Sequence, residues 1–347
     1  MSLPAVALLA WLAPAAFAQE YREPEGAPLP DYARVLPVTP GAEKGFVPPD
    51  NGLPSIMLTG YWPPTNEMLR RFSTSPTQNP EGWIGENWEG RGYNVYAFFP
   101  EFPGGLGKGE GDFEVDYQDT SADFWPLAEQ VSPLAIITFG RAAFDTKWEM
   151  EWRTRNLSSW VNDYQAPTQP TPSPPDGSVP PGTIRYSTLP MAEIAKAVGT
   201  AGLGIVPYVD TTGDAGAFLC EYIGYHACWY HDLHTEPYHP DHVVAAGHIH
   251  VGYKSSLDNC IAATEITVRT LIDYLDEQLL PDCDYDGDGD VDLDDYAEFA
   301  DCLSGPSQAA GFVAPSTDCL EAFDFYQDGD IDERDFLGFQ ELFTGGR

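Results

Sequence analysis

Five short apolar runs, each bounded by glycine or proline, constrain the fold of this chain most strongly. They predict buried β-strands at residues 55–59, 94–99, 134–139, 205–209 and 245–251. Helical patterns lie between or beside these runs, at about 83–90, 119–130, 190–201, 214–231 and 261–279. This alternation predicts an α/β fold, a three-layer α/β/α sandwich in which helices cover both faces of a mainly parallel sheet.

Two proline-rich stretches predict irregular structure. Residues 19–53 are rich in Pro, Gly and acidic side chains and lack periodicity, which is typical of an extended arm. Residues 166–182 contain too many prolines for a helix or a strand. Because predicted strands continue on both sides, we interpret 166–182 as a loop inserted in one domain, 54–280, although a linker between two domains is the alternative.

Cys220 is the candidate nucleophile. It follows Asp214, a good helix N-cap, and no proline interrupts the residues after it. A cysteine early in a helix gains support for its thiolate from the amide dipoles, and a nearby histidine is a common partner of such a thiolate. His250, thirty residues later, supplies that imidazole. Spacing alone leaves open a second interpretation, in which Cys220 is a buried core residue.

Four segments resemble motifs of the pyroglutamyl peptidase I (pyrrolidone-carboxylate peptidase) family. Residues 215–220 (AGAFLC) resemble its A-G-x-Y-x-C nucleophile motif, and 247–251 (GHIHV) are similar to its G-F-I-H-V. Residues 186–191 (YSTLPM) resemble Y-x-S-T-L-P-V with one residue fewer. Glu151 falls at the interval of the acid in the family's G-x-A-G-G-R-x-x-I-T-x-E motif. The order of the four motifs is that of the family, over roughly residues 54–280.

The resemblance implies a cysteine exopeptidase of the omega-peptidase type, whose substrate is a peptide with a blocked N-terminus. Cys220 would attack the carbonyl of an N-terminal pyroglutamyl residue, and His250 would take and return the proton. Glu151 would orient the imidazole or shape the pocket. No cofactor is expected for catalysis.

The resemblance is weaker at the residues that would hold the lactam ring. The family's T-G-F-x-P-F segment is TGYWPP here, so the first aromatic becomes Tyr61 and the second becomes Pro64. Arg141 stands where the family commonly has glutamine, and His248 stands at a Phe position. We expect Tyr61 and Arg141 to bind the substrate. The alternative is a catalytically degraded peptidase fold that serves as a binding protein.

The tail, residues 281–347, predicts a small all-α calcium-binding domain. Residues 284–295 place carboxylates as in an EF-hand loop, and 324–335 repeat the pattern with Tyr326 in place of one carboxylate, which predicts a weaker or empty site. The duplication resembles a dockerin, which implies a cohesin-like or cell-surface partner; calcium-stabilised helices without a partner are the alternative. The predicted Ca²⁺ ligands are Asp284, Asp286, Asp288, Asp290, Asp295, Asp324, Asp328, Asp330 and Asp335.

Charge excludes some partners. The formal net charge is -37, and the tail alone holds 19 acidic and 2 basic residues. Phosphates would be repelled, so we expect neither nucleic acid nor anionic lipid as a partner.

Residues 1–18 are apolar and end in Ala-Phe-Ala, which predicts a cleaved signal peptide rather than a spanning helix. An unusual cytosolic extension is the alternative, since no Lys or Arg precedes the apolar run. We therefore expect a secreted, periplasmic or surface protein that does not span the membrane. Of six cysteines, Cys302 and Cys319 flank the turn between the acidic loops and are the preferred disulfide pair, although spacing leaves other pairings open.

All seven histidines lie between residues 226 and 250, with H-x-x-H pairs at 231–234 and 239–242. Such pairs are potential zinc ligands. The prolines among them favour a polar loop near the site, and a zinc amidohydrolase is the weaker interpretation.

Overall fold

The computed structural model describes residues 22–37, 46–49, 51–142, 145–211, 215–235, 239, 241–278, 281, 283–287, 290–326 and 328–344. The predicted signal peptide, Asp214 and Asp288 lie outside these residues. None of the described helices is both long and apolar enough to cross a membrane.

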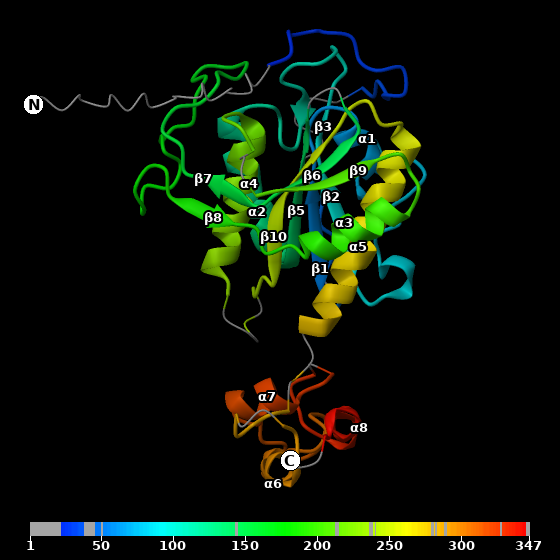
Figure 1. Cartoon of the computed structure of the whole chain (residues 1–347), viewed down its shortest axis with the longest axis vertical. Helices are drawn as coiled ribbons and strands as arrows, with labels where there is room; N and C mark the ends of the chain where they lie inside the picture. Colours follow the sequence, from blue (N-terminus) through cyan, green and yellow to red (C-terminus); the bar gives the residue numbers. More distant parts are fainter. Residues whose placement is uncertain are drawn as a thin grey trace, which may run out of the picture.

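A six-stranded sheet forms the centre of the larger part of the chain (Figure 1). Its strand order is β2 (Asn94–Phe98), β1 (Ser55–Thr59), β5 (Pro133–Arg141), β10 (Ala245–Val251), β6 (Lys147–Glu151) and β9 (Val206–Asp210). The first four strands are parallel to one another, whereas β6 is antiparallel to β10 and parallel to β9. The expected mainly parallel sheet is confirmed.

Helices cover both faces of the sheet, which gives three layers (Figure 1). Alternate side chains of the buried strands point to opposite faces. One face packs against α1 (Thr65–Leu69), α3 (Met191–Thr200) and α5 (Leu257–Gln278). The other packs against α2 (Tyr117–Val131) and α4 (Leu219–Leu233).

Two helix predictions need correction. The segment 83–90 contains only a 3₁₀ turn, Trp88–Gly90, because Asn87 and Glu89 have φ values of 40° and 54°, which an α-helix does not allow. Helix α4 begins at Leu219 and not near residue 214, so Phe218 occupies its N-cap position in place of Asp214. Cys220 is nevertheless early in this helix, as its second residue.

Sequence patterns missed several shorter elements. The sheet strand β6 and the helix α1 were not expected. Two small hairpin-like pairs join β3 (Pro100–Glu101) to β4 (Glu110–Gly111) and β7 (Arg153–Arg155) to β8 (Ile184–Tyr186). The proline-rich loop 166–182 lies between β7 and β8 and contains no regular element. It is anchored through buried Asp176, whose carboxylate accepts hydrogen bonds from Arg185 and Tyr225.

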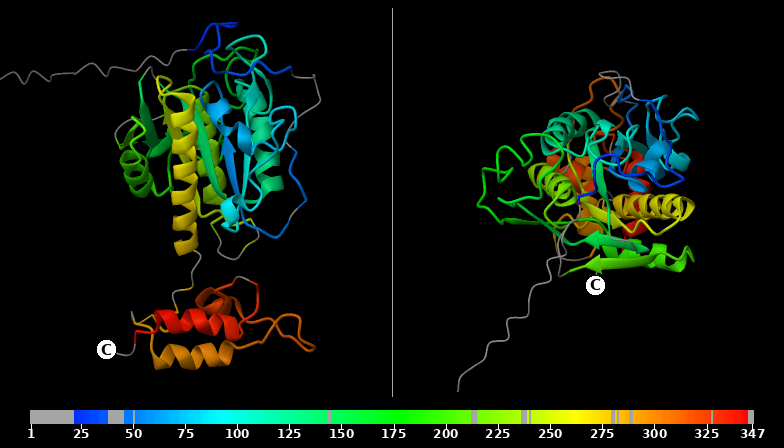
Figure 2. Two further views of the ribbon diagram at one scale, coloured as in Figure 1. Left: turned by 90° about the vertical axis from the view of Figure 1, so that its right-hand side faces the viewer. Right: turned by 90° about the horizontal axis from the view of Figure 1, so that it is seen from above.

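The tail forms a small helical unit with its own apolar core. It consists of α6 (Leu293–Cys302), α7 (Thr317–Phe323), which was not predicted, and α8 (Glu333–Leu342). Helices α6 and α8 lie side by side (Figure 2), with Phe299 and Phe339 5.3 Å apart between ring centroids. Each begins with a capping box, formed by Asp292 with Asp295 and by Asp332 with Asp335.

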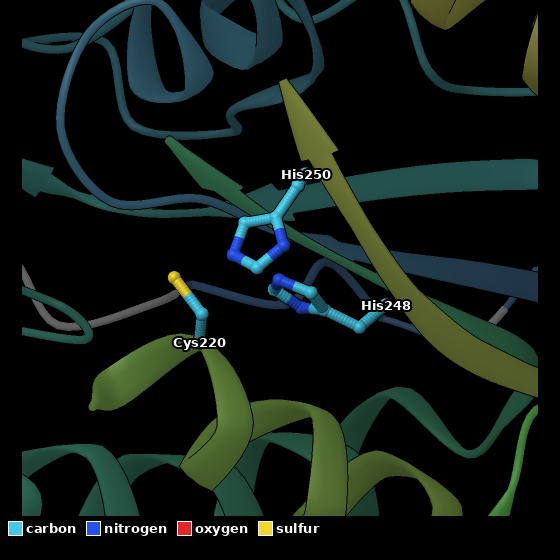
Figure 3. A group of neighbouring side chains, drawn as sticks. All are labelled: Cys220, His248 and His250. Carbon is cyan, nitrogen blue, oxygen red and sulfur yellow. The ribbon is translucent and has the colours of Figure 1, made fainter. Parts of the chain in front are cut away.

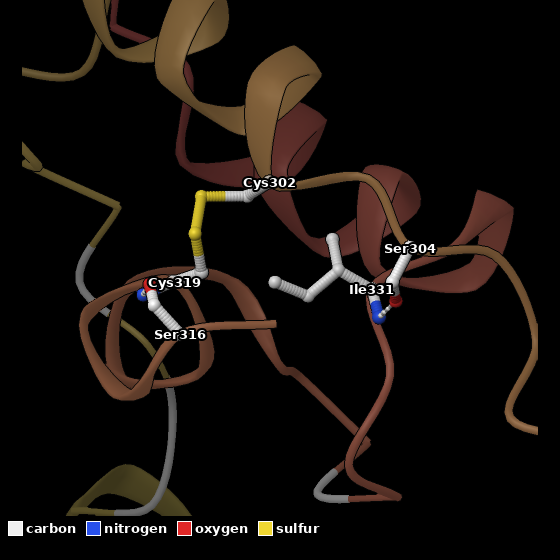
Figure 4. Close-up of a disulfide and its surroundings, with 5 residues drawn as sticks. All are labelled: Cys302, Ser304, Ser316, Cys319 and Ile331. Atoms are coloured by element: carbon white, nitrogen blue, oxygen red, sulfur yellow. Dashed lines mark hydrogen bonds between the residues drawn. A yellow bond between two sulfur atoms is a disulfide. The ribbon is translucent and has the colours of Figure 1, made fainter. Parts of the chain in front are cut away.

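A disulfide joins Cys302 to Cys319 (Figure 4), which confirms the preferred pair. It ties the end of α6 to the first turn of α7. Beside it, Ser304 and Ile331 exchange hydrogen bonds, so the segment after α6 is fixed to the second acidic loop.

Candidate active site

The start of α4 meets the carboxyl ends of β5 and β10, and Cys220 lies at this junction (Figure 3). The segment that leads into α4 is held by Arg155, which donates to the Gly216 carbonyl, and by the Val161 N–H, which donates to the Ala217 carbonyl. The buried Glu221 carboxylate in turn accepts bonds from the backbone and side chain of Arg155. These contacts fix the first turn of the helix and therefore the thiol.

Gly140 provides the space for the sulfur. A Cβ atom at this position would lie 2.4 Å from Cys220 Sγ and 2.9 Å from His248 Nε2, closer than van der Waals contact allows. Any side chain at Gly140 would displace one of these two groups. Because Gly140 is the register partner of His250, the sulfur also lies next to that histidine.

His250 is held between a carboxylate and the thiol. Its Nδ1 is 2.7 Å from Glu151 Oε1, and Cys220 is its other hydrogen-bond partner, so Nε2 is the atom that faces the sulfur. Burial acts to lower the pKa of His250, but the negative charge of Cys220 and the hydrogen bonds to Cys220 and Glu151 outweigh it. The pKa of His250 is therefore raised well above its usual range. This favours a positively charged imidazolium at His250, next to the Cys220 sulfur.

Glu151 reaches His250 from β6, the strand that runs antiparallel to β10. Its side chain is almost fully buried, and its second oxygen, Oε2, has no hydrogen-bond partner. Met150 and Trp148 point to the opposite face and belong to the core beneath α3 and α5. The structure thus brings together Cys220, His250 and Glu151, which come from three separate elements.

Tyr61 and Arg141, the two expected substrate-binding residues, lie close enough to Cys220 to interact electrostatically with it. Tyr61 is buried, and its hydroxyl shares a 2.9 Å hydrogen bond with Thr120. Burial raises the pKa of Tyr61, so its hydroxyl stays neutral. The side chain of Arg141 is 8% exposed and forms an ion pair with Glu23 of the N-terminal arm.

The extended arm was expected from the sequence, but its contact with the site and the aromatic group nearby were not. The Glu23 carbonyl accepts a hydrogen bond from Tyr164, and the Arg141 guanidinium lies over the rings of Trp62 and Tyr253. Trp62 also contacts Phe218, the residue before α4, at 6.1 Å between centroids. Trp62 follows Tyr61 directly, and that adjacency was the available signal. The pairing of Glu23 with Arg141 spans 118 residues and had no local signal.

In the described part of the chain, the other histidines are not gathered into a group of three potential metal ligands. His231 contacts Asp232, and His234 contacts the Tyr230 carbonyl and stacks on its ring. His226 is buried within α4, and burial lowers its pKa to about 4. Within the described ranges, the groups of potential ligands that include histidine involve only His248 and His250.

The tail gathers carboxylates at both acidic loops. In the described residues, two sets of three carboxylate oxygens lie within 4.8 Å of one another, from Asp284, Asp286 and Asp295 and from Asp330, Asp332 and Asp335. Asp332 was not among the expected ligands. Asp290 is partly buried.

Asp324 and Asp328 complete the second loop. Asp324 accepts bonds from the amides of Asp328 and Gly329, and burial, together with the charges of Asp335 and Asp328, raises its pKa to about 6. Asp330 Oδ1 is buried without a hydrogen-bond partner. Carboxylates that repel one another and retain open acceptor positions fit an oxygen-binding cation such as Ca²⁺.

Neither a protein-family model nor a curated protein matches this chain. Among solved structures it is similar to the pyrrolidone carboxyl peptidase from Thermococcus litoralis, with 18% identity, a TM-score of 0.47, and coverage of 65% of this chain and 96% of that one. An E192A mutant of the Pyrococcus furiosus pyrrolidone carboxyl peptidase is 16% identical, with a TM-score of 0.45, and the match covers 64% of this chain and 99% of that one. Pyroglutamyl peptidase I from Bacillus amyloliquefaciens is 18% identical, with a TM-score of 0.43, and the match covers 63% of this chain and 95% of that one. At this level of similarity, any function has to be argued from the site.

Proposed function

We propose that this chain is a cysteine peptidase that removes an N-terminal pyroglutamyl residue or a related amide-linked group. The observation that carries the proposal is the position of His250, whose two ring nitrogens are engaged by Glu151 and by Cys220. A thiol, an imidazole and an orienting carboxylate in this order are the groups that nucleophilic acyl transfer requires.

The chemistry would proceed in two steps. The Cys220 thiolate attacks the substrate carbonyl carbon, a C–S bond forms, and the amide C–N bond breaks while His250 gives its proton to the leaving amine. Water then attacks the thioester, His250 accepts the water's proton, and the C–S bond breaks to release the acid. Amide groups in the first turn of α4 would stabilise the oxyanion, aided by the positive end of the helix dipole.

We also propose that the protein is exported and that its tail is a dockerin-like domain that binds Ca²⁺. The carboxylate groups of the two acidic loops and the capped helices that follow them support Ca²⁺ binding. Leu293 on α6 and Leu337 on α8 are 70% and 58% exposed, and such side chains suit contact with a cohesin-like or surface partner. The predicted signal peptide, residues 1–18, is the reason for proposing secretion to the periplasm, cell surface or medium.

The direct test is hydrolysis of pyroglutamyl-aminocoumarin by the reduced full-length protein. We expect release of the fluorophore that iodoacetamide and Cys220→Ser both abolish. Cys228→Ser is the matched control, because Cys228 lies in the same helix but is buried and burial raises its pKa to about 12. No release, together with slow alkylation of Cys220, would contradict the proposal. No release with rapid alkylation would move the proposal to a different acyl substrate.

One observation favours a second function, that of a binding protein on a peptidase fold. One nitrogen of the Arg141 guanidinium near the thiol is paired with Glu23, so the arm competes with a substrate for this group. Under this alternative, Cys220→Ser would leave the affinity for a pyroglutamyl peptide unchanged, and no turnover would be measured with the wild-type protein.

A further inference from the structure

His248 brings a second imidazole to the sulfur of Cys220. It is fully buried, its Nδ1 is 2.8 Å from the Thr138 hydroxyl, and its Nε2 has no hydrogen-bond partner. Because a Cβ atom on Gly140 would lie within 3 Å of both Cys220 Sγ and His248 Nε2, these two atoms face the same small space. The peptidase chemistry proposed above makes no use of His248.

Cys220, His248 and His250 form a group suited to a thiophilic metal. One ligand atom from each residue lies within 4.8 Å of the others (Figure 3). In a tetrahedral Zn²⁺ site, a sulfur and a nitrogen ligand are about 3.5 Å apart and two nitrogens about 3.3 Å apart, from bond lengths of about 2.3 and 2.0 Å. Small side-chain rotations therefore suffice to bring the three atoms to coordination distance.

The groups behind the two histidines also match those of a metal site. A histidine that binds a metal through one ring nitrogen usually has the other held by a carboxylate or another polar group, which fixes the ring. His250 Nδ1 is held by Glu151, and His248 Nδ1 by Thr138, whose hydroxyl is also 3.2 Å from the Gly247 carbonyl. Both Nε2 atoms are left to face the sulfur.

Burial and ligand chemistry support the same ligand class. His248 is fully buried, and its Nε2 makes no hydrogen bond, so this ring nitrogen is open to a ligand. One thiolate and two imidazoles favour Zn²⁺ and related soft or borderline cations over Ca²⁺ or Mg²⁺, which prefer oxygen ligands.

We propose that Cys220, His248 and His250 bind a thiophilic divalent cation of the Zn²⁺ type, and that the bound ion occupies the sulfur and blocks its reaction. Coordination by His250 displaces the proton from its Nε2, and this proton is released to the solvent. The proposal goes beyond the peptidase function and does not depend on it, because coordination needs only the three ligands. His248 is the residue that turns a thiol–imidazole pair into a three-ligand site.

The test titrates the reduced full-length protein with Co²⁺ in the presence of saturating Ca²⁺, which occupies the carboxylate groups of the tail. Thiolate coordination gives a near-ultraviolet sulfur-to-cobalt charge-transfer band, and carboxylates do not. We expect this band in the wild-type protein, its loss on addition of Zn²⁺, and its absence in Cys220→Ala. His248→Phe, which keeps a ring of similar size, should weaken Co²⁺ binding by about 100-fold or more, since even loss of a group behind a ligand costs about 10- to 100-fold.

His231→Gln is the matched control, because His231 lies on the same helix as Cys220 but outside the three-ligand group, and it should bind Co²⁺ like the wild type. His248→Gln replaces His248→Phe if the latter does not fold. Protection of Cys220 from iodoacetamide by Zn²⁺ but not Mg²⁺ in the wild-type protein provides a measurement that needs no variant.

A charge-transfer band of equal strength and affinity in the His248 variants would overturn the proposal, as would absence of the band and of Zn²⁺ protection in the wild type. Failure of the peptidase proposal alone would look different. The protein would then bind Co²⁺ through His248 but would not hydrolyse the pyroglutamyl substrate.

Discussion

Replacing Glu151 by Gln tests whether its carboxylate supports the reactive state of the site. The change keeps the size of the side chain but removes the negative charge 2.7 Å from His250 Nδ1. A hydrogen bond to a charged group contributes about 1.5–3 kcal/mol. Because about 1.36 kcal/mol corresponds to a tenfold change in rate, we expect kcat/KM to fall about 10- to 150-fold if the bond strengthens in the transition state.

The pH dependence gives a second, independent readout. Glu151 is among the groups that raise the pKa of His250, so its neutralisation lowers that pKa and narrows the pH range in which the imidazolium supports the thiolate. We expect alkylation of Cys220 by iodoacetamide to be slower than in the wild type at pH 6–7, and the two rates to converge at alkaline pH.

Glu149→Gln is the matched control. Glu149 lies two residues away on the same strand face and is the register partner of His250, yet it makes no hydrogen bond to the imidazole among those described. It should change kcat/KM by less than about threefold. Equal effects of the two substitutions, with both proteins folded by circular dichroism, would refute the role assigned to Glu151.

Three other measurements test the arm and the tail. Glu23→Gln leaves the buried Arg141 guanidinium without its carboxylate, so the free energy of unfolding should fall by about 2–5 kcal/mol in denaturant titrations followed by Trp fluorescence; an unchanged midpoint would contradict the ion pair. Asp295→Ala should abolish most of the Ca²⁺-induced stabilisation of the tail in calorimetry and Asp335→Ala less of it, because the second loop lacks one carboxylate; equal losses would argue against unequal sites. Without Ca²⁺, the folded tail binds more protons than the unfolded chain because the pKa of Asp324 is raised to about 6, so its stability should increase as pH falls from 7 to 4.5, and a decrease over this range would count against the burial of that carboxyl group.

The sequence predicted the strands that are apolar on both faces and missed those that are not. Each of the five predicted runs became a strand of the central sheet within about two residues. Strand β6 reads Lys-Trp-Glu-Met-Glu, and its charged side chains point toward the site while Trp148 and Met150 fill the core. Such alternation is the pattern of a half-buried strand, but it extends over only five residues here, and Lys, Glu and Met favour helices, so β6 was overlooked.

Contacts between residues far apart in the sequence could not be predicted from local sequence patterns. Cys220 and His250 were proposed from residue chemistry and motif resemblance, and Glu151 from a motif interval alone. Nothing local indicates that Glu23 meets Arg141 or that His248 turns its Nε2 toward the sulfur. The helix expected over 83–90 is absent because Asn87 and Glu89 have positive φ values. The residue types in this segment do not by themselves indicate these backbone conformations.

The pairing of β6 with β10 places two glutamates near His250, and only one of them is hydrogen-bonded to the imidazole. Directly across the antiparallel pair, His250 faces Glu149 and His248 faces Glu151. The hydrogen bond nevertheless joins His250 to Glu151, the diagonal neighbour, which long side chains can reach. Glu149 instead lies 4.0 Å from Lys147 and is more exposed than Glu151. Strand register alone would have selected Glu149, and a slip of one residue would have turned both carboxylates into the core. The identity of the orienting acid therefore follows from the diagonal contact, and the comparison of the two glutamine variants tests that contact directly.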